Sequence, residues 1–433
     1  MIINIHPSQA NGTVMAPPSK SMAHRLLICA GLAKGQSIIH NVVLSEDIAA
    51  TLDCLCALGA SWEIYQNKVI ISGTDLKSPI QDNNLNCRES GSTLRFILPL
   101  ALAQGSKINL LGSKRLLERP LDIYQKIADA NNFLFDHQKE QVTVKGPLTP
   151  GDYIIPGNVS SQFITGLLYT LPLLQGDSTL TVTPPIESMS YINMTLQALR
   201  EFGIEINVKN NTVVAPEFEQ EKDFYLLEQN MSDQEIVFLI NGEQEYLAAE
   251  KTVEGDFSNA AFLEAFNLFG GNVKLKGLDL NSAQGDKVYS NLFKQLKLGK
   301  AQISLKDCPD LGPILFAISA ALNGGIFTKT KRLAIKESDR AQAMADELAK
   351  FGIQTLIRKN LVEIRADNFQ KPEQNLCGHN DHRIVMSLAV LASLTGAVIE
   401  GAAAVNKSFP DFFQVIEKLG IKFERLDRSK NNQ

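Results

Sequence analysis

Six copies of one pattern run along the 433-residue chain. Each copy has a small or polar start, an apolar helix-like run, a glycine and then a short β-branched strand. The starts lie near Ser19, Glu89, Asn158, Asp256, Asp307 and His379, and the glycines are Gly35, Gly105, Gly176, Gly270, Gly324 and Gly396. A supersecondary unit repeated in this way buries its apolar face against its neighbours. We therefore expect an α/β fold assembled from six related units.

A second helix follows the strand in each copy. In the first copy Ser45 caps this helix, Ile48, Leu52 and Leu55 form its apolar stripe, and Gly59 ends it. Alternating helices and strands imply parallel strand pairing with right-handed crossovers. Three copies can pack their inner helices together and leave their sheets outside, so six copies predict two lobes.

The length of the chain also favours two domains, of roughly 200 residues each. The longest gap between starts separates the third copy from the fourth and places the boundary near Val253. We expect a first lobe at 19–252 and a second lobe at 1–18 plus 253–433, with a two-strand hinge near 15–19 and 250–254. The strand before Pro17 would then pair into the second lobe.

Composition excludes several classes of function. The formal charge of -5 gives no sign of a nucleic-acid or membrane partner. Apolar stretches are helix-sized and interrupted by Gly or Pro, and the N-terminus lacks a basic segment followed by an apolar one, so a cytoplasmic protein is expected. Cys377, His379 and His382 resemble a ligand cluster, but no second pair completes a metal site. We expect inert thiols and no metal.

Cations gather at the starts of the predicted helices, among them Lys20, Arg25, Arg340 and Arg383. A helix N-terminus carries about half a positive charge, so a cation there is unfavourable unless an anion is also present. Any one of these cations can be a solvated surface charge, but equivalent positions in repeats converge in space. The residues alone predict a cationic cleft, tolerable because it binds a small polyanion with hydroxyl groups, and they do not name a reaction.

Seven motifs in order resemble those of the 5-enolpyruvylshikimate-3-phosphate synthase family of enolpyruvyl transferases. They are Pro18–Arg25, Glu89–Arg95, Glu118–Pro120, Val159–Phe163, Lys336–Arg340, Asn380–Arg383 and Lys407–Asp411. The resemblance implies a two-lobed inside-out α/β barrel, in which each lobe has three βαβαββ-type repeats with helices inside and sheets outside. It also implies transfer of the enolpyruvyl group of phosphoenolpyruvate to the 5-hydroxyl of shikimate 3-phosphate. This reaction releases phosphate, uses no cofactor and belongs to chorismate and aromatic amino acid biosynthesis.

The resemblance also implies binding residues for both substrates. Those for shikimate 3-phosphate are Lys20, Ser21, Arg25, Ser160, Ser161, Gln162, Ser188, Tyr191, Asp310, Arg332 and Lys336. Those for phosphoenolpyruvate are Lys20, Gly91, Arg119, Gln162, Arg340, Arg383 and Lys407. Gly91 suits a point where the backbone approaches a ligand closely, because any side chain would intrude.

The chemistry requires a base for the attacking hydroxyl and a proton for the methylene carbon. Asp310 matches the family's carboxylate near the 5-hydroxyl and is the expected base. Glu337 and Lys336 are the candidates for proton delivery, and Lys336 should also stabilise the transferring group. Three positions depart from the family pattern. Glu89 and Arg332 each stand where relatives carry Asn, and Pro18 stands where they usually carry Gly.

Two other functions remain open. The first is an enolpyruvyl transferase of the same fold that acts on a nucleotide sugar, but that family begins its site with Lys-Asn and has a reactive Cys before its Arg-Pro. This chain has Lys20-Ser21 and no Cys in 113–118. The second is a non-catalytic repeat protein that only binds anions, and Asp310, Lys336 and Glu337 argue against it. The expected partners are small-molecule substrates, and the chain is expected to act as a monomer.

Overall fold

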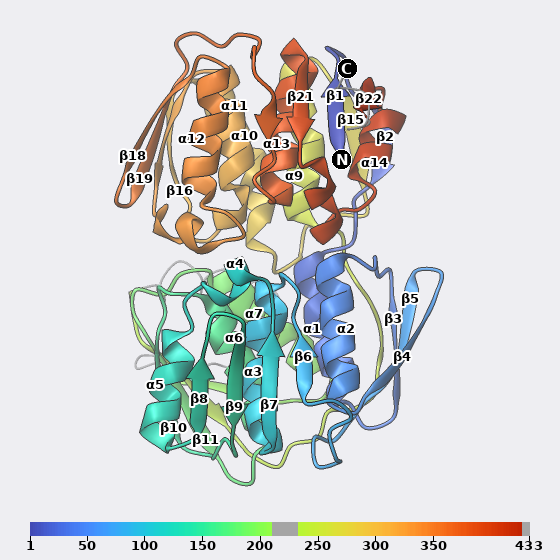
Figure 1. Cartoon of the computed structure of the whole chain (residues 1–433), viewed down its shortest axis with the longest axis vertical. Coiled ribbons are helices and arrows are strands. Elements are labelled where there is room, and N and C mark those ends of the chain that lie inside the picture. The colour runs from blue at the N-terminus through green and yellow to red at the C-terminus, as the bar shows by residue number, and fades with distance from the viewer. Residues whose placement is uncertain (210–232, 427–433) are drawn as a thin grey trace. The chain divides into compact units, whose positions relative to one another are not determined.

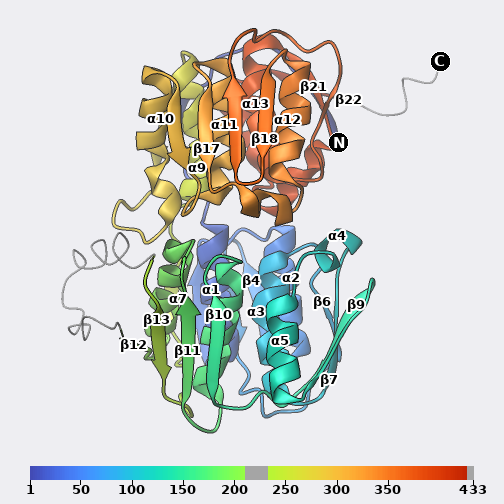
Figure 2. The same ribbon diagram turned by 90° about the vertical axis from the view of Figure 1, so that its left-hand side faces the viewer.

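The computed structural model describes residues 1–209 and 233–426 (Figure 1). Its contacts divide the chain into two compact units. The first unit is Lys20–Glu254, and the second unit is Met1–Ser19 together with Gly255–Gln433. In each unit, helices occupy the interior and strands lie along the outside (Figures 1 and 2).

The first unit contains three copies of the repeat. Its inner helices are α1 (Lys20–Leu32), α3 (Gly91–Gln104) and α6 (Ser161–Thr170), extended by η1 (Leu171–Leu173). The strands that follow them are β3 (Gln36–His40), β7 (Lys107–Leu111) and β11 (Ser178–Thr183), and the second helices are α2 (Glu46–Ala57), α5 (Asp122–Asn131), which short α4 (Lys114–Leu117) precedes, and α7 (Met189–Glu201). The remaining strands are β14 (Glu250–Thr252), β4 (Ser61–Tyr65), β5 (Lys68–Ser72), β6 (Asn84–Asn86), β8 (Leu134–His137), β9 (Gln141–Lys145), β10 (Asp152–Pro156), β12 (Asn207–Lys209) and β13 (Ile236–Ile240).

The sheets of the first unit share one plan. Their orders are β14-β3-β5-β4, β6-β7-β9-β8 and β10-β11-β13-β12. In each sheet the first two strands are parallel and the later strands are antiparallel. The parallel strands flank α3 in the second sheet and α6 in the third. The predicted parallel pairing is confirmed across α3 and α6, whereas the strands before and after α1 each pair with another strand. Figure 2 shows the third sheet along the outside of the unit with helices behind it.

The second unit repeats this plan. Its inner helices are α9 (Phe257–Ala265), α11 (Gly312–Ala321) and α13 (His382–Thr395), and its second helices are α10 (Tyr289–Leu298), α12 (Arg340–Lys350) and α14 (Phe412–Lys418). Its strands are β1 (Ile2–Ile5), β2 (Asn11–Met15), β15 (Asn272–Lys276), β16 (Ala301–Ser304), β17 (Gly325–Thr328), β18 (Gln354–Arg358), β19 (Leu361–Arg365), β20 (Leu376–Cys377), β21 (Ala397–Glu400) and β22 (Phe423–Leu426). Short 3-10 turns are η2 (Phe266–Phe269), η3 (Gly285–Val288), η4 (Pro309–Leu311), η5 (Lys331–Ile335) and η6 (Ala402–Lys407). The sheet orders are β16-β17-β19-β18, β20-β21-β1-β22 and β15-β2.

Strands β2 and β14 do not pair with the strand that follows the next inner helix in the sequence. Strand β2 comes just before α1 in the sequence, yet it pairs in parallel with β15 of the second unit. Strand β14 comes just before α9, yet it pairs in parallel with β3 of the first unit. At each passage of the chain from one unit to the other, the strand before the inner helix therefore belongs to one unit and the helix to the other.

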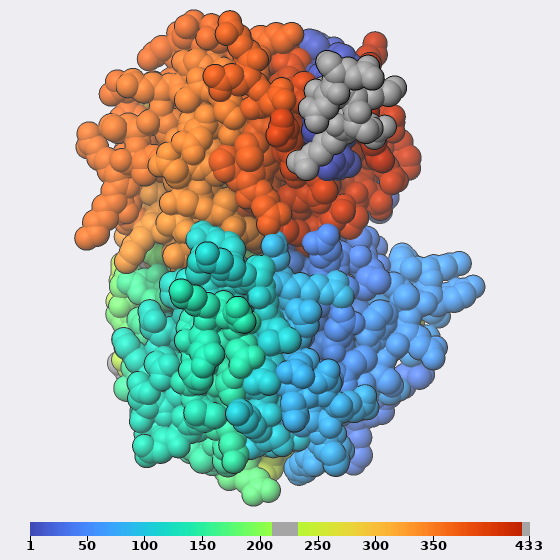
Figure 3. All heavy atoms as spheres, in the orientation of Figure 1, coloured from blue at the N-terminus to red at the C-terminus, as the bar shows by residue number. Residues whose placement is uncertain are grey.

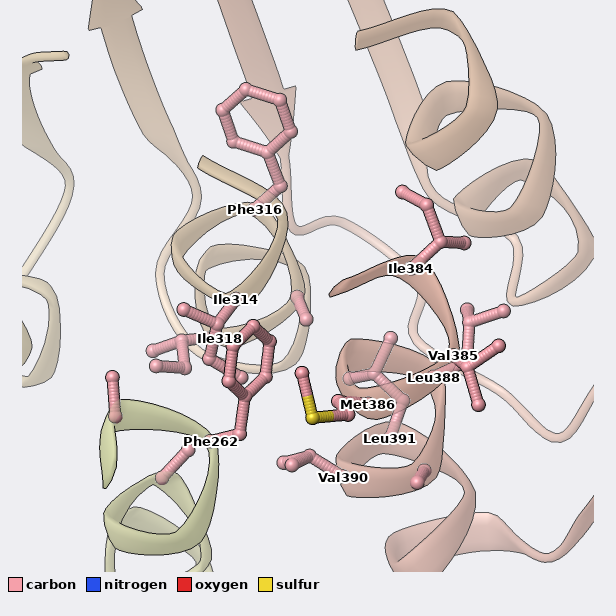
Figure 4. Close-up of a cluster of buried hydrophobic side chains, with 14 of the residues drawn as sticks. Phe262, Ile314, Phe316, Ile318, Ile384, Val385, Met386, Leu388, Val390 and Leu391 are labelled. Atoms are coloured by element: carbon pink, nitrogen blue, oxygen red, sulfur yellow. The ribbon is translucent and has the colours of Figure 1, made fainter. Parts of the chain in front are cut away.

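The core of the second unit lies between its inner helices. Phe262, Ile314, Ile318, Met386 and Val390 are fully buried, and Figure 4 shows their side chains meeting between α9, α11 and α13. Helices that are apolar on all sides are typical of such buried positions. The predicted arrangement of inner helices and outer sheets is confirmed. In the described residues, however, the sheets remain separate and open, so they do not close into one continuous barrel.

The stops of the repeat follow the prediction. All six predicted stop glycines have positive φ, and Asn132 ends α5 at φ 56°. The β4–β5 hairpin projects from the surface of the first unit (Figures 1 and 3). Among the described residues, no helix combines the length and apolar character needed to cross a membrane.

Candidate active site

Lys20 is the first residue of α1, and its ammonium group is paired within the first unit. Its Nζ donates to Oδ2 of Asp47 at 2.8 Å, and the two side chains are 13% and 10% exposed. Asp47 lies in the first turn of α2, whose N-cap is Ser45. The carboxylate therefore holds the ammonium group in place without burying it completely.

Arg25 is a buried cation of the first unit that bonds neutral oxygens. The side chain is buried, and the guanidinium donates to the hydroxyl of Thr195 at 3.0 Å and to the backbone carbonyls of Ser21 and Tyr191 at 2.8 and 2.9 Å. No carboxylate in the described part of the chain pairs with it. Burial lowers the pKa of the Arg25 guanidinium. Because a buried charge without a counter-ion is costly, this position suits an anionic ligand.

Gly91 and Arg119 lie in direct contact. Gly91 is the first residue of α3, and Arg119 is a buried residue after α4. A Cβ atom at position 91 would lie 2.3 Å from NH1 of Arg119 and 2.6 Å from its Cζ. The prediction was that Gly91 admits a ligand. In the described residues, the space left by the absence of a side chain at Gly91 is occupied by the guanidinium of Arg119.

The start of α6 carries hydroxyl and amide groups. Ser160 is its N-cap and accepts from the backbone N–H of Gln162 at 3.3 Å. The Gln162 side chain accepts from Arg95 at 3.1 Å and donates to Ser92 at 3.0 Å. Ser161, between Ser160 and Gln162 in the sequence, is buried. Groups that both donate and accept suit a ligand with hydroxyls, and these bonds tie α6 to α3.

The start of α7 brings Tyr191 beside Arg25. The carbonyl of Tyr191 accepts from Arg25, and its ring centroid lies 5.9 Å from Cζ of Arg25. Ser188, the N-cap, is buried and adopts a left-handed conformation with φ 60° and ψ 42°. Such conformations are uncommon for residues other than glycine and concentrate at functional sites.

In the second unit, Arg340 contacts three carboxylates at once. Its NH1 donates to Oδ1 of Asp310 at 2.8 Å, its NH2 to Oε2 of Glu337 at 2.7 Å and its Nε to Oδ2 of Asp381 at 2.8 Å. Arg340 begins α12, and Asp381 is the N-cap of α13. Both are buried. This guanidinium therefore links α12, α13 and the turn before α11.

Asp310 lies in η4 and accepts from three cations. Its Oδ1 lies 2.8 Å from NH1 of Arg340 and 3.1 Å from Nζ of Lys336, and its Oδ2 lies 3.1 Å from NH2 of Arg383. Burial acts to raise the pKa of this carboxyl, but Arg383, Lys336 and Arg340 outweigh burial and hold the pKa well below its usual range. Asp310 is therefore ionised at neutral pH, as a base must be, although its proton affinity is low in this arrangement.

Three further predicted residues of the second unit are Lys336, Lys407 and Arg332. Lys336 follows η5, and burial lowers the pKa of its ammonium group although Asp310 opposes the shift. Lys407 is a buried residue in η6 whose Nζ donates to the carbonyl of Asn380 at 2.6 Å. Arg332 is buried in η5 and donates to the carbonyl of Lys306.

The premise that only a bound ligand makes clustered cations tolerable is wrong for the second unit. The cations and carboxylates that pair there are Lys336, Arg340, Arg383, Asp310, Glu337 and Asp381. Their formal charges balance within the protein. Acidic residues in the same motifs supply this balance, whereas Arg25 bonds neutral oxygens.

Asp381 and Asp47 hold site residues in place but were not among the predicted ones. Asp381 is fully buried and bonds Arg340, and Asp47 pairs with Lys20. Each stands near a helix N-terminus, where an acid is typical for helix reasons alone. This common role at a helix start gave no sign that each carboxylate is also the counter-ion of a site cation. The available signals were the place of Asp381 inside the motif Asn380–Arg383 and that of Asp47 just after the cap Ser45.

The residues considered as metal ligands do not come together. In residues 1–209 and 233–426, no group of three His, Cys, Asp or Glu side chains could hold a metal ion. Cys377 is exposed, His379 bonds Glu347 with its Nε2 at 2.9 Å, and His382 is buried in α13. The buried thiols are those of Cys29, Cys54, Cys87 and Cys308.

Known proteins resemble this chain along nearly its whole length. A family model described as EPSP synthase (3-phosphoshikimate 1-carboxyvinyltransferase) matches residues 5–228 and 226–416. A protein named 3-phosphoshikimate 1-carboxyvinyltransferase from Clostridium novyi (strain NT) is 36% identical, over 96% of this chain and 97% of its own. A protein of the same name from Clostridium kluyveri is 36% identical, over 99% of each chain.

Solved structures share the fold. An EPSP synthase structure from Acinetobacter baumannii superposes with a TM-score of 0.73 at 22% identity, over 98% of this chain and 99% of the other. A second structure of EPSP synthase from that organism gives a TM-score of 0.74 at 21% identity, over 99% and 100%. At this identity they bear on the fold alone, and they confirm the predicted two-domain α/β fold. Together with the family model and the curated relatives, the motifs and geometry above establish that the chain belongs to the EPSP synthase family.

Proposed function

We propose that the chain is a 3-phosphoshikimate 1-carboxyvinyltransferase. The observation that carries this proposal is the 36% identity, along 96% of the chain, with a protein of that name. The enzyme transfers the enolpyruvyl group of phosphoenolpyruvate to the 5-hydroxyl of shikimate 3-phosphate and releases phosphate, a step toward chorismate and the aromatic amino acids. Neither the nucleotide-sugar transferase nor the non-catalytic binding protein gains support from the comparisons.

We assign shikimate 3-phosphate chiefly to the first unit. The buried guanidinium of Arg25, which bonds only neutral oxygens, supports a role in binding the substrate phosphate. Tyr191 lies beside it. The hydroxyl and amide groups that complete this assignment are those of Ser21, Ser160, Ser161, Gln162 and Ser188.

We assign phosphoenolpyruvate to cations of both units. The contact between Gly91 and Arg119 supports a fixed position for one guanidinium. Arg340 and Arg383 are buried and hold Asp310 between them. The further residues of this assignment are Lys20, Gln162 and Lys407.

Asp310 is assigned as the base, with a condition that its contacts impose. Three cations stabilise its ionised form, so it binds protons weakly while they stay in place. An anionic substrate that attracts Arg340 and Arg383 would weaken their hold on Asp310 and raise its proton affinity toward that of a useful base. Substrate binding and base activation are therefore one event in this scheme.

Lys336 and Glu337 are assigned to proton delivery. Burial lowers the pKa of Lys336, which eases release of its proton, and Glu337 accepts from Arg340 at 2.7 Å. The remaining assignments for shikimate 3-phosphate in the second unit are Asp310, Lys336 and Arg332. A cytoplasmic monomer that binds neither nucleic acid nor membrane stays a prediction.

The direct test measures phosphate release with each substrate alone and with both. Release that requires phosphoenolpyruvate and shikimate 3-phosphate together supports the proposal. Release with a nucleotide sugar in place of shikimate 3-phosphate would favour the other transferase. No release with either acceptor, from a chain that binds the anions, would favour the non-catalytic alternative.

A further inference from the structure

Asp286 is a buried carboxyl group that the scheme above leaves without a role. It lies in η3, and its Oδ1 has no hydrogen-bond partner among the described residues. Its other oxygen, Oδ2, lies 2.5 Å from Oγ of Ser258. A buried carboxylate oxygen without a donor is costly when the group is ionised. The environment therefore favours the neutral carboxyl.

Ser258 connects Asp286 to the cluster around Asp310. The Oγ of Ser258 accepts from NH1 of Arg383 at 2.7 Å, and NH2 of the same guanidinium donates to Oδ2 of Asp310 at 3.1 Å. A serine hydroxyl has one proton and can donate only once, so its proton, or that of Asp286, occupies the short contact between them. One hydroxyl thus links Asp286 to the guanidinium assigned to phosphoenolpyruvate.

We propose that Asp286 is a positioning residue whose protonation, acting through Ser258 on Arg383, sets how tightly the site binds phosphoenolpyruvate. The inference rests on the proposed function, because it takes Arg383 as a ligand of that substrate. Arg383 pairs with the ionised carboxylate of Asp310. Once Asp286 is ionised, its negative charge also acts on this guanidinium and opposes the incoming anion. Anion binding and proton uptake at Asp286 are therefore coupled, each favouring the other.

The charged groups around Asp286 support a change of protonation near neutral pH. Burial, and then the charge of Asp310, raise its pKa to about 7, while Arg383 and the bond from Ser258 act in the opposite direction. Asp256, the N-cap of α9, adds a further rise. Other ionisable groups on neighbouring segments are Cys308, Lys287, Tyr289 and Glu264.

The test compares wild type with Asp286→Asn from about pH 5.5 to about pH 9. This range extends to both sides of neutral pH, where Asp286 is expected to change protonation. The amide keeps the size of the carboxyl group but cannot ionise. Asp367→Asn is the matched control, since Asp367 is an exposed aspartate of the same unit. The KM for phosphoenolpyruvate is measured at saturating shikimate 3-phosphate. Dividing the wild-type KM by that of the variant at each pH cancels the titration of the substrate itself.

The KM ratio of wild type to Asp286→Asn should rise from near unity at about pH 6 to about tenfold above pH 8, which corresponds to one pKa unit of coupling. Ser258→Ala keeps the carboxyl but cuts the link. Because the charge of Asp286 still acts through space, the ratio of the Ser258→Ala KM to that of Asp286→Asn should rise less with pH than the wild-type ratio does. Asp367→Asn should follow wild type at every pH. A ratio for Asp286→Asn that stays constant with pH would overturn the proposal, whatever its value.

A second measurement does not depend on turnover. Infrared difference spectra between low and high pH should show a protonated-carboxyl band in wild type that Asp286→Asn lacks, and inorganic phosphate should move its midpoint to higher pH. A missing band, or a midpoint that phosphate leaves unchanged, would refute the role of Asp286. If wild type released no phosphate from its two proposed substrates, the proposed function would fail, while the infrared result would still decide the role of Asp286.

Discussion

Gly91 and Arg119 occupy what would be one side-chain position. The guanidinium NH1 of Arg119 lies where a Cβ atom of residue 91 would be only 2.3 Å away. No real side-chain contact is this short, so the guanidinium can lie here only because position 91 has no side chain. Gly91, at the start of α3, thereby determines the position of the Arg119 guanidinium, a candidate group for binding an anion.

Gly91→Ala should weaken phosphoenolpyruvate binding and leave the fold intact. The new methyl group must displace the end of a flexible side chain and meets no backbone atom among its nearest contacts. We expect an increase in KM for phosphoenolpyruvate of about tenfold and a change in unfolding free energy below about 1 kcal/mol. Steady-state kinetics and urea unfolding measure the two effects. An unchanged KM would remove Arg119 from the phosphoenolpyruvate site.

Arg25→Met should chiefly weaken shikimate 3-phosphate binding. The guanidinium bonds only neutral oxygens, so its loss leaves no buried carboxylate without a partner. We expect the KM for shikimate 3-phosphate to rise by about a hundredfold, the usual effect of removing one charged partner of a bound anion. The KM for phosphoenolpyruvate is the internal control. A similar rise in both constants would indicate a general disturbance of the first unit.

Arg340→Met should destabilise the protein far more than Arg25→Met does. It leaves Asp310, Glu337 and Asp381 without their shared cation. Removing one partner of a buried ion pair typically costs about 3–5 kcal/mol. Urea unfolding of both variants gives the comparison. Equal losses of unfolding free energy would contradict the view that Arg340, unlike Arg25, has internal counter-ions.

Asp310→Asn should lower kcat by roughly a hundredfold to ten-thousandfold, the range typical of a lost general base. The amide retains an oxygen that can accept from Arg340 or Arg383, so substrate affinity should change much less. Asp367→Asn serves again as the control for loss of a carboxylate. A variant with near wild-type turnover would remove Asp310 from the chemistry.

The stability of Asp286→Asn relative to wild type should depend on pH. Burial and Asp310 raise the folded-state pKa of Asp286 to about 7, whereas an unfolded aspartate has a pKa of about 3.9. The stabilisation from its neutral form is therefore fully present below about pH 4 and is lost as pH rises through about 7. Over that window wild type should lose up to roughly 1.4 kcal/mol per pH unit relative to the variant. Urea unfolding at several pH values measures this difference, and parallel curves would contradict it.

The fold was predictable where local sequence decides it. A helix must end where the backbone takes a positive φ, and Gly105 and Gly270 do this directly at the ends of their helical segments. Asn132 shows the same behaviour without glycine. Repeated local signals of this kind also predicted the parallel strands, because a helix between two strands leaves the chain few other ways to pair them.

The charge network was not predictable from local sequence. Arg340 bonds Asp310 and Asp381, which are 30 and 41 residues away along the chain. The sequence states which residues carry charge, but only the packing of α11, α12 and α13 decides which charges meet. Asp286 escaped notice for the same reason, since nothing near it in sequence indicates its link through Ser258 to Arg383.

The position of β1 determines when the second unit can be completed during synthesis. This strand leaves the ribosome long before its partners β21 and β22, at Ala397–Glu400 and Phe423–Leu426. At about 5–20 residues per second, the ribosome needs roughly 20–80 seconds to supply them. Through that interval the apolar side chains of Ile3 and Ile5 lack these neighbours. A nascent chain interrupted late would therefore carry all residues of the first unit and an unfinished second unit.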